Sequence, residues 1–323
     1  MRSIVSPVAV IVLLAGLAVA GFMLMQPAPG SPSEVWVVYA GDPGNPYVDA
    51  ARDGVLGAAR NQTFAYSEFA PATADRLETA FADAPVNSPE LVIVQDSGTW
   101  TGAADRWAAA HPGTRFVVID GEAASLPNVR TMAIAADGVS YLAGVLAAAA
   151  ADGRPVAVLL GMPHPVMNAY CDGFMAGAES VAPGTRAEVR YVGNDTRGYA
   201  DPAGAAVIAG DLYRNGTVVI YAACGGSSLG VIDAADERTG RFAIGVDRDL
   251  SPLGPDVVLG SAVKHLDRIV QAAIENGLDE AFAPGGAEAG LADGATALIL
   301  NPRFAAYGPV VASERETAER MDQ

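Results

Sequence analysis

The amino-acid sequence predicts an α/β fold in which parallel sheets are covered by helices on both faces, arranged in two lobes. Apolar runs rich in β-branched residues alternate along the chain with alanine-rich stretches of helical length. Runs that are apolar throughout indicate strands buried on both faces. The chain has 323 residues, 51% of them hydrophobic, which is enough for two cores.

The expected strands are short runs dominated by valine, leucine, isoleucine or aromatic residues. In chain order they cover 35–40, 91–95, 115–119, 156–160, 187–192, 217–223 and 242–246. The stretches between them are rich in alanine and glycine, which lets a helix lie close to a sheet. Helices are expected at 45–61, 98–111, 138–151, 166–181, 202–213 and 265–277.

The N-terminal residues are expected to form an export signal or a membrane anchor. Arg2 precedes an apolar run from Ile4 to Met25, and about 22 apolar residues can cross a bilayer core of roughly 30 Å. The sequence AVA ending at Ala20 is similar to a signal-peptidase site, but the apolar run continues beyond it, which favours a retained anchor over a cleaved signal. In both cases the remainder is exported. Residues 1–33 are thus anchor or signal plus linker.

Composition argues against several classes of function. A net charge of −17 and a pI near 4.4 argue against nucleic acid as a partner, because nucleic-acid binders need clustered Lys and Arg. Cys171 and Cys224 lie in different expected elements without metal or redox spacing, and the histidines are scattered. We therefore expect no metal site and no cofactor.

Aspartates follow the carboxyl ends of several expected strands, namely Asp42, Asp96, Asp120 and Asp247. Ligands of open parallel sheets bind at this edge, so acids should line the cleft. A carboxylate accepts hydrogen bonds from the neighbouring hydroxyls of a polyol, whereas it repels phosphate. Each aspartate has an alternative role as the cap of the following helix.

Lys264 stands where a helix is expected to begin. With Ser261 as the N-cap, Lys264 occupies the third helical position, where the helix dipole disfavours a cation by about 0.3–1 kcal/mol. That cost is tolerable if the ammonium group points at Asp247 or at a ligand hydroxyl, and the alternative is a solvated surface lysine. Removing the charge should then leave the ligand-free protein as stable as before, or slightly more so.

Enzyme signatures are absent from the sequence, which lacks GxxxxGK[ST], GxGxxG after the first strand, and GxSxG. CGGSSLG at 224–230 contains Ser227 and Ser228, but no histidine is placed to activate them. The favoured interpretation is a Gly/Ser turn that opens a helix and offers backbone N–H groups to a ligand. We expect no catalytic activity.

Several segments resemble the basic membrane protein family of ABC-transporter substrate-binding proteins, which includes the purine nucleoside receptors. They are IGVDRD at 244–249, VVLGSAVKHLD at 257–267, CGGSSLGVIDAA at 224–235 and DGVSYLAGVLAA at 137–148. The pair GVD and SAVK is the most specific element. NDTRG at 194–198 departs from the family pattern as an insertion before YADP, and Val48 stands where the family has an asparagine.

The resemblance implies a type I periplasmic binding protein, with two Rossmann-like lobes and a ligand cleft between them. We expect lobe 1 to comprise 34–129 plus 261–285, and lobe 2 to comprise 130–260 plus 286–323.

The same resemblance implies roles for particular residues. Asp247 and Lys264 would hold the ribose hydroxyls of a nucleoside. Tyr47 and Tyr199 would contribute to a stack on the base. Gly226 and Asp120 would lie near the ligand.

The resulting hypothesis is an extracytoplasmic solute-binding protein of an ABC importer, which binds a nucleoside, preferably a purine nucleoside, and delivers it to permease subunits. It would be tethered to the outer face of the cell membrane, or secreted if the N-terminal segment is cleaved. The alternative is a membrane-anchored sensor of a nucleoside or a riboflavin-like ligand, without a transport role. A nucleoside hydrolase is a third possibility, but its general acid and base are not identifiable in the sequence.

Overall fold

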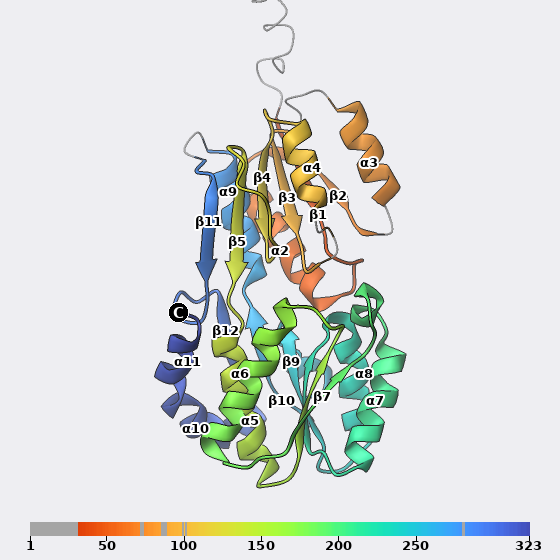
Figure 1. The fold of residues 1–323 in the computed structure, drawn as a ribbon, viewed down its shortest axis with the longest axis vertical. Coiled ribbons are helices and arrows are strands. Elements are labelled where there is room, and N and C mark those ends of the chain that lie inside the picture. Colours follow the sequence, from red (N-terminus) through yellow and green to blue (C-terminus); the bar gives the residue numbers. More distant parts are fainter. Residues whose placement is uncertain (1–31, 72–73, 85–88, 99, 101, 280–281) are drawn as a thin grey trace, which may run out of the picture.

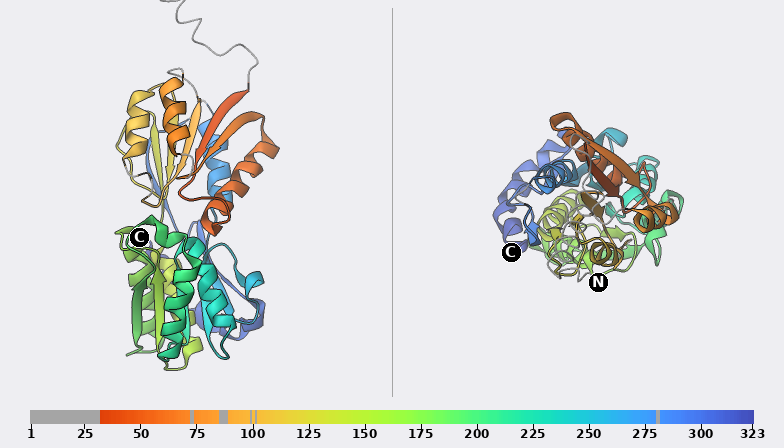
Figure 2. Two further views of the ribbon diagram at one scale, coloured as in Figure 1. Left: turned by 90° about the vertical axis from the view of Figure 1, so that its right-hand side faces the viewer. Right: turned by 90° about the horizontal axis from the view of Figure 1, so that it is seen from above.

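The computed structural model describes residues 32–323, except 72–73, 85–88, 99, 101 and 280–281. Two α/β lobes follow one another along the long axis of the molecule (Figures 1 and 2). The expected anchor or signal, with its apolar run from Ile4 to Met25, lies outside the described residues. No helix within the described residues is long and apolar enough to cross a membrane.

Lobe 1 contains a six-stranded parallel sheet of order β11-β5-β4-β3-β1-β2. Its strands are β1 (Ser33–Val38), β2 (Phe64–Phe69), β3 (Leu91–Gln95), β4 (Arg115–Ile119), β5 (Val129–Ile134) and β11 (Gly285–Ala289). One face is covered by α2 (Pro46–Asn61) and α9 (Leu266–Gly277), the other by α3 (Ala74–Asp83) and α4 (Ala103–Ala110). The side chains of successive strand residues point to opposite faces of the sheet: Val35 packs toward α2 and α9, and Trp36 toward α3 and α4.

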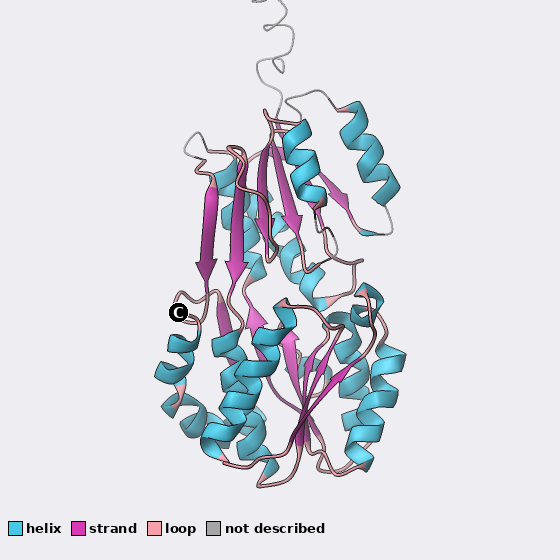
Figure 3. Cartoon of the chain, viewed as in Figure 1, coloured by secondary structure: helices cyan, strands magenta, loops and turns pink. Residues whose placement is uncertain are grey.

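Lobe 2 contains a second six-stranded sheet, of order β12-β10-β9-β8-β6-β7. Its strands are β6 (Val156–Leu160), β7 (Ala187–Tyr191), β8 (Val219–Ala223), β9 (Phe242–Asp247), β10 (Val258–Lys264) and β12 (Thr296–Leu300). All neighbours are parallel except β10 and β12. Figure 3 shows that helices flank this sheet as they flank the first.

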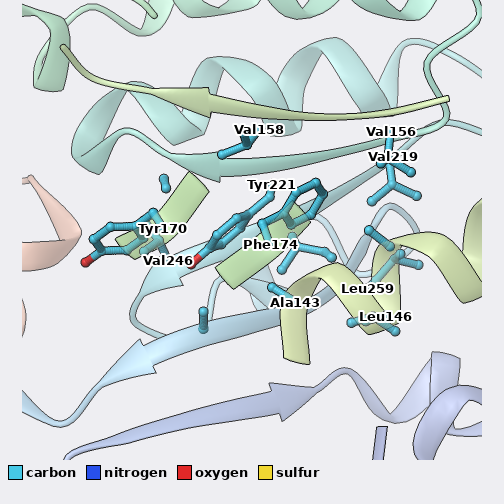
Figure 4. Close-up of a cluster of buried hydrophobic side chains, with 14 of the residues drawn as sticks. Ala143, Leu146, Val156, Val158, Tyr170, Phe174, Val219, Tyr221, Val246 and Leu259 are labelled. Atoms are coloured by element: carbon cyan, nitrogen blue, oxygen red, sulfur yellow. The ribbon is translucent and has the colours of Figure 1, made fainter. Parts of the chain in front are cut away.

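The helices of lobe 2 contribute to three clusters of buried hydrophobic residues among the described residues. They are α5 (Asp137–Ala151), α6 (Val166–Val181), α7 (Pro202–Arg214), α8 (Ser228–Asp236), α10 (Gly308–Ser313) and α11 (Arg315–Met321). Phe174 of α6 stacks on Tyr221 of β8 with 5.5 Å between the ring centroids (Figure 4). The backbones of α5 and α6 touch, because a Cβ atom on Gly144 would overlap the carbonyl of Phe174. The small residues of these helices therefore permit close packing.

The chain passes between the two sheets three times, after β5, after β10 and after β11. The expected lobe boundaries at 129/130 and 260/261 need correction, because they cut through β5 and β10 respectively. β5 belongs to the sheet of lobe 1 and β10 to that of lobe 2, and lobe 1 extends through β11 to Ala289. The lobe to which a strand belongs is decided by the strands with which it pairs. The sequence analysis had not predicted five of the strands, namely β2, β5, β10, β11 and β12.

The C-terminal end of the chain binds two of these crossings. The Asp322 carboxylate accepts hydrogen bonds of 2.7 Å from the backbone N–H groups of Gly138 and Leu291. A Cβ atom on Gly138 would overlap the carbonyl of Ala318, and one on Gly290 would overlap Asp322 itself. Both glycines are thus required for this close approach.

Candidate functional site

A pocket of about 370 Å³ lies between the two lobes, at the carboxyl ends of strands of both sheets. Its volume is in the range of small-molecule binding sites. Most residues that the sequence singled out line it, namely Asp42, Tyr47, Asp120, Tyr199, Gly226, Asp247 and Lys264. The two sheets thus bring together side chains that are up to about two hundred residues apart in sequence, as strand-end reasoning predicts.

Asp120 and Asp247 occupy corresponding places in the two lobes. Asp120 directly follows β4, and Asp247 is the last residue of β9. Both have left-handed backbone conformations, with φ of 60° and 68°, which aspartate tolerates better than most residues. Each side chain is more than nine-tenths buried. Such conformations cluster at functional sites, where the surrounding structure holds them in place.

Lys264 lies in a strand and not in a helix, contrary to the expectation. It is the last residue of β10, which β9 and β12 flank on either side. Ser261 is therefore no helix cap, and its hydroxyl accepts a hydrogen bond of 3.0 Å from the Leu250 N–H. The α9 helix begins after the strand, at Leu266. Lys264 is only 4% exposed, which excludes the surface lysine of the alternative interpretation.

The ammonium group of Lys264 forms an ion pair with Asp120 across the lobes. The same Asp120 oxygen lies 3.0 Å from the Tyr47 hydroxyl, which is also 3.0 Å from the Asp96 carbonyl oxygen. Lys264 Nζ further lies 5.6 Å from the centre of the Tyr47 ring. Tyr47 and Asp120 of lobe 1 thus hold the lysine of lobe 2 in place.

Asp247 is left with no hydrogen bond to its carboxylate from any described residue, although it is buried. Burial raises the pKa of the Asp247 carboxyl to about 7, Lys264 opposes the rise and Asp120 adds to it. The buried carboxylates of Asp120 and Asp247 thus lie near a single cation, Lys264, and that of Asp247 has no hydrogen-bond donor among the described residues. A ligand that donates hydrogen bonds fits this arrangement.

Asp96 and Asp42 have different roles from one another. Asp96 does not line the pocket, and its Oδ1 accepts backbone N–H bonds from Ser97, Gly98 and Trp100 at 2.8, 2.9 and 3.0 Å. Asp96 therefore has the capping role that the sequence analysis gave as the alternative to ligand binding. Asp42 lies at the rim of the pocket and is exposed.

Aromatic and apolar side chains form much of the rest of the pocket wall, together with polar residues such as Thr196 and Arg197. Sequence reasoning missed Tyr170, whose ring centre lies 5.4 Å from Lys264 Nζ. The signal for it was weak, because Tyr170 shares the buried face of α6 with Met167 and Phe174, as an ordinary core residue would. Figure 4 shows Tyr170 beside the core residue Tyr221.

Asn45 also lines the pocket and was missed. It caps α2, because its Oδ1 accepts a 3.0 Å hydrogen bond from the Tyr47 N–H. Its amide nitrogen lies against Gly225 of lobe 2, where a Cβ atom would be 3.4 Å away. The capping signature was present in the sequence, but it indicates where a helix begins and not a contact with a ligand.

The segment Gly225–Ser227 forms a 3₁₀ turn that leads into α8, in agreement with the predicted Gly/Ser turn. The Ser227 hydroxyl donates to the Gly198 carbonyl and accepts from the Asp201 N–H, both at 2.8 Å. Its hydrogen-bonding capacity is therefore used structurally. Cys171 and Cys224 are both unpaired thiols.

The ABC transporter substrate-binding protein PnrA-like family, Bmp, matches residues 44–303 of the chain. The chain belongs to this family. Proteins similar to this Bmp family member include basic membrane protein D of Borreliella burgdorferi, 29% identical over 60% of the chain. Another is the ABC transporter nucleoside-binding protein BmpA of Lactococcus lactis subsp. cremoris, 30% identical over 55% of the chain. The alignments span 58% and 54% of these relatives' lengths.

Solved structures show the same fold. A solute-binding protein of an ABC transporter system from Aeropyrum pernix K1 is 20% identical, with a TM-score of 0.73 over 90% of each chain. A transcriptional activator of the comK gene from Bacillus halodurans, 21% identical, has a TM-score of 0.70 over 90% of this chain and 98% of its own. The Bmp family member thus has the type I periplasmic-binding-protein fold that its sequence predicts.

Proposed function

We propose that this Bmp family member is the extracytoplasmic receptor of an ABC importer and holds a nucleoside, preferably a purine nucleoside, between its lobes. One observation carries the proposal: Lys264, Asp120 and Asp247 are buried together at one end of an interlobe pocket that three tyrosine rings also line. A ribose needs acceptors and donors for vicinal hydroxyls, and a base needs flat apolar surfaces.

The charges at the polar end support a neutral ligand. Asp120 and Asp247 outnumber Lys264, so this end carries a net negative charge when both aspartates are ionised. A phosphate placed there would be repelled and would lose its hydration. Asp247 and Lys264 would hold the ribose hydroxyls, with Asp120 and Gly226 close by and the rings of Tyr47, Tyr170 and Tyr199 as the aromatic wall.

Family membership supports the transport role. The family is that of PnrA-like ABC transporter substrate-binding proteins, and the Lactococcus relative is named as nucleoside-binding. The partners would then be permease subunits, and the N-terminal apolar run would act as the anchor or signal.

The test uses the purified full-length chain and two measurements. Mass spectrometry of the ligand retained through purification should find a nucleoside. Calorimetry with nucleosides and their 5′-monophosphates should find tighter binding of the nucleosides. Tighter binding of a monophosphate, or no binding of any nucleoside, would overturn the proposal.

A further inference from the structure

We propose that Tyr199 reads the sugar of the ligand through its phenolic hydroxyl, in addition to presenting its ring to the base. This inference rests on the proposed nucleoside-binding function and assigns a specificity-determining residue to it. Its basis is the combination of a buried, unpartnered hydroxyl, its position beside the charged end of the pocket, and a backbone environment that fixes it there.

The Tyr199 hydroxyl is buried and has no hydrogen-bond partner among the described residues. Two other buried tyrosines have hydrogen-bond partners: Tyr213 donates to the Phe242 carbonyl at 2.9 Å, and Tyr221 lies 3.2 Å from the Ser140 hydroxyl. Since buried polar groups are paired in the great majority of cases, this hydroxyl stands out, and it belongs to a residue that lines the pocket.

The charged residues of the pocket act on this hydroxyl. Burial raises the pKa of Tyr199 to about 12; Lys264 lowers it, and Asp247 and Asp120 raise it. The phenol is therefore protonated at neutral pH and can donate one hydrogen bond and accept another. Lys264, Asp247 and Asp120, the residues proposed to hold the ribose, line the same pocket as Tyr199, which points to a sugar hydroxyl as its partner.

The backbone around Tyr199 fixes the ring. A Cβ atom on Gly161 would overlap the Tyr199 ring, and one on Gly198 would overlap the Gly161 carbonyl. Ser227 binds the backbone on both sides of Tyr199, because its hydroxyl donates to the Gly198 carbonyl and accepts from the Asp201 N–H. A 3₁₀ turn (Thr196–Tyr199), which begins inside the NDTRG segment, thus holds Tyr199 in place. A group positioned so rigidly needs little reordering when a ligand binds.

The competing explanation is that Tyr199 is a packing residue only. Tyr199→Phe separates the two, because it keeps the ring and removes the hydroxyl alone. An unpartnered hydroxyl contributes nothing to folding, so this variant should melt at the same temperature as the parent, or slightly higher. A ligand contact would appear as lost affinity without lost stability.

The experiment measures binding of adenosine, inosine and their 2′-deoxy, 3′-deoxy and 5′-deoxy forms to the full-length parent and to Tyr199→Phe. We expect the variant to bind the complete nucleoside about tenfold more weakly. One deoxy form should bind both proteins equally, which identifies the hydroxyl that Tyr199 contacts. Tyr191→Phe removes an exposed hydroxyl of the same lobe and should change nothing.

Each other outcome overturns a defined part of the inference. Unchanged affinity for all probes, or a loss accompanied by a lower melting temperature, would show that the hydroxyl has no ligand role. An equal loss for every deoxy form would place the partner on the base and overturn the sugar assignment. If the parent binds no nucleoside, the proposed function fails, and this inference fails with it.

Discussion

Arg248 and Asp53 form an ion pair between the two lobes, with 3.0 Å between Arg248 Nη2 and Asp53 Oδ2. Arg248 directly follows Asp247 at the end of β9, and Asp53 lies in α2. The side chains are 42% and 51% exposed, so the pair contributes only about 0.2–1 kcal/mol. Because separation of the lobes would break it, that contribution stabilises the closed form.

Arg248→Ala should therefore speed release of the ligand by a factor of about 1.5 to 5, with little change in the rate of binding. Stopped-flow measurements of dissociation check this, and the difference should shrink in high salt, which screens exposed charges. Arg315→Ala, which breaks a comparable pair with Glu319 inside α11, is the control. Equal release rates for the parent and Arg248→Ala would assign the pair no role in closure.

Asp247→Asn should change stability in a pH-dependent way. The folded pKa of about 7 lies above the ordinary value of 3.8, so the native state holds this proton more tightly than the unfolded chain. Asp247 thus lowers stability progressively as pH rises from about 4 to 7, and fully above that range. In the ligand-free state the variant should melt higher than the parent at pH 8 and equally at pH 4. Asp42→Asn, at the exposed rim, should not reproduce the gain.

Nucleoside binding itself should weaken on acidification. A ligand that donates hydrogen bonds to Asp247 binds the ionised carboxylate, so binding at pH 6 must first remove a proton. Affinity should fall about tenfold between pH 8 and pH 6. Calorimetry in two buffers of different ionisation enthalpy should detect proton release near pH 6, and Asp247→Asn should abolish it. A flat profile for the parent would show that the ligand does not engage the carboxylate.

Lys264→Met should destabilise the protein, contrary to the expectation drawn from a helical Lys264. The variant leaves Asp120 and Asp247 buried without a cation, and breaking a buried ion pair typically costs about 3–5 kcal/mol. Adding Asp120→Asn should restore much of this loss, because it removes one of the two charges. Urea unfolding of the parent, both single variants and the double variant gives the coupling energy. Additive losses would contradict a shared network.

Strand-end reasoning predicted the acidic lining of the candidate pocket because it depends on local sequence, whereas Tyr47 and Tyr199 came from the family resemblance. Asp120 and Asp247 both follow apolar strands, and the parallel sheets bring such ends together. The same reasoning failed for Asp96, because an aspartate after a strand can equally cap the next turn. Which of the two occurs depends on where the following backbone N–H groups lie, and local sequence does not specify that.

Long-range pairing determined what the sequence did not predict. β10 contains Gly260, Ser261 and Lys264, which are poor strand formers, yet it is buried along its whole length between β9 and β12. Pairing with its two neighbours therefore makes this segment a strand. Lys264, which the sequence placed in a helix, is the last residue of that strand. The pairing of Lys264 with Asp120 depends on how the lobes approach one another, which no local pattern encodes.

The interleaving of the two lobes along the chain has a consequence for synthesis on the ribosome. The part of the apolar face that lies on β3 and β4 and packs on α9 remains uncovered until Leu266, Val270 and Ile274 have left the exit tunnel. By then β6 to β10 of lobe 2 have emerged, so the first lobe to be translated is completed late. We expect nascent chains stalled before residue 266 to be degraded by protease in lobe 1 and to bind chaperones. Chains released at Gln323 should resist both.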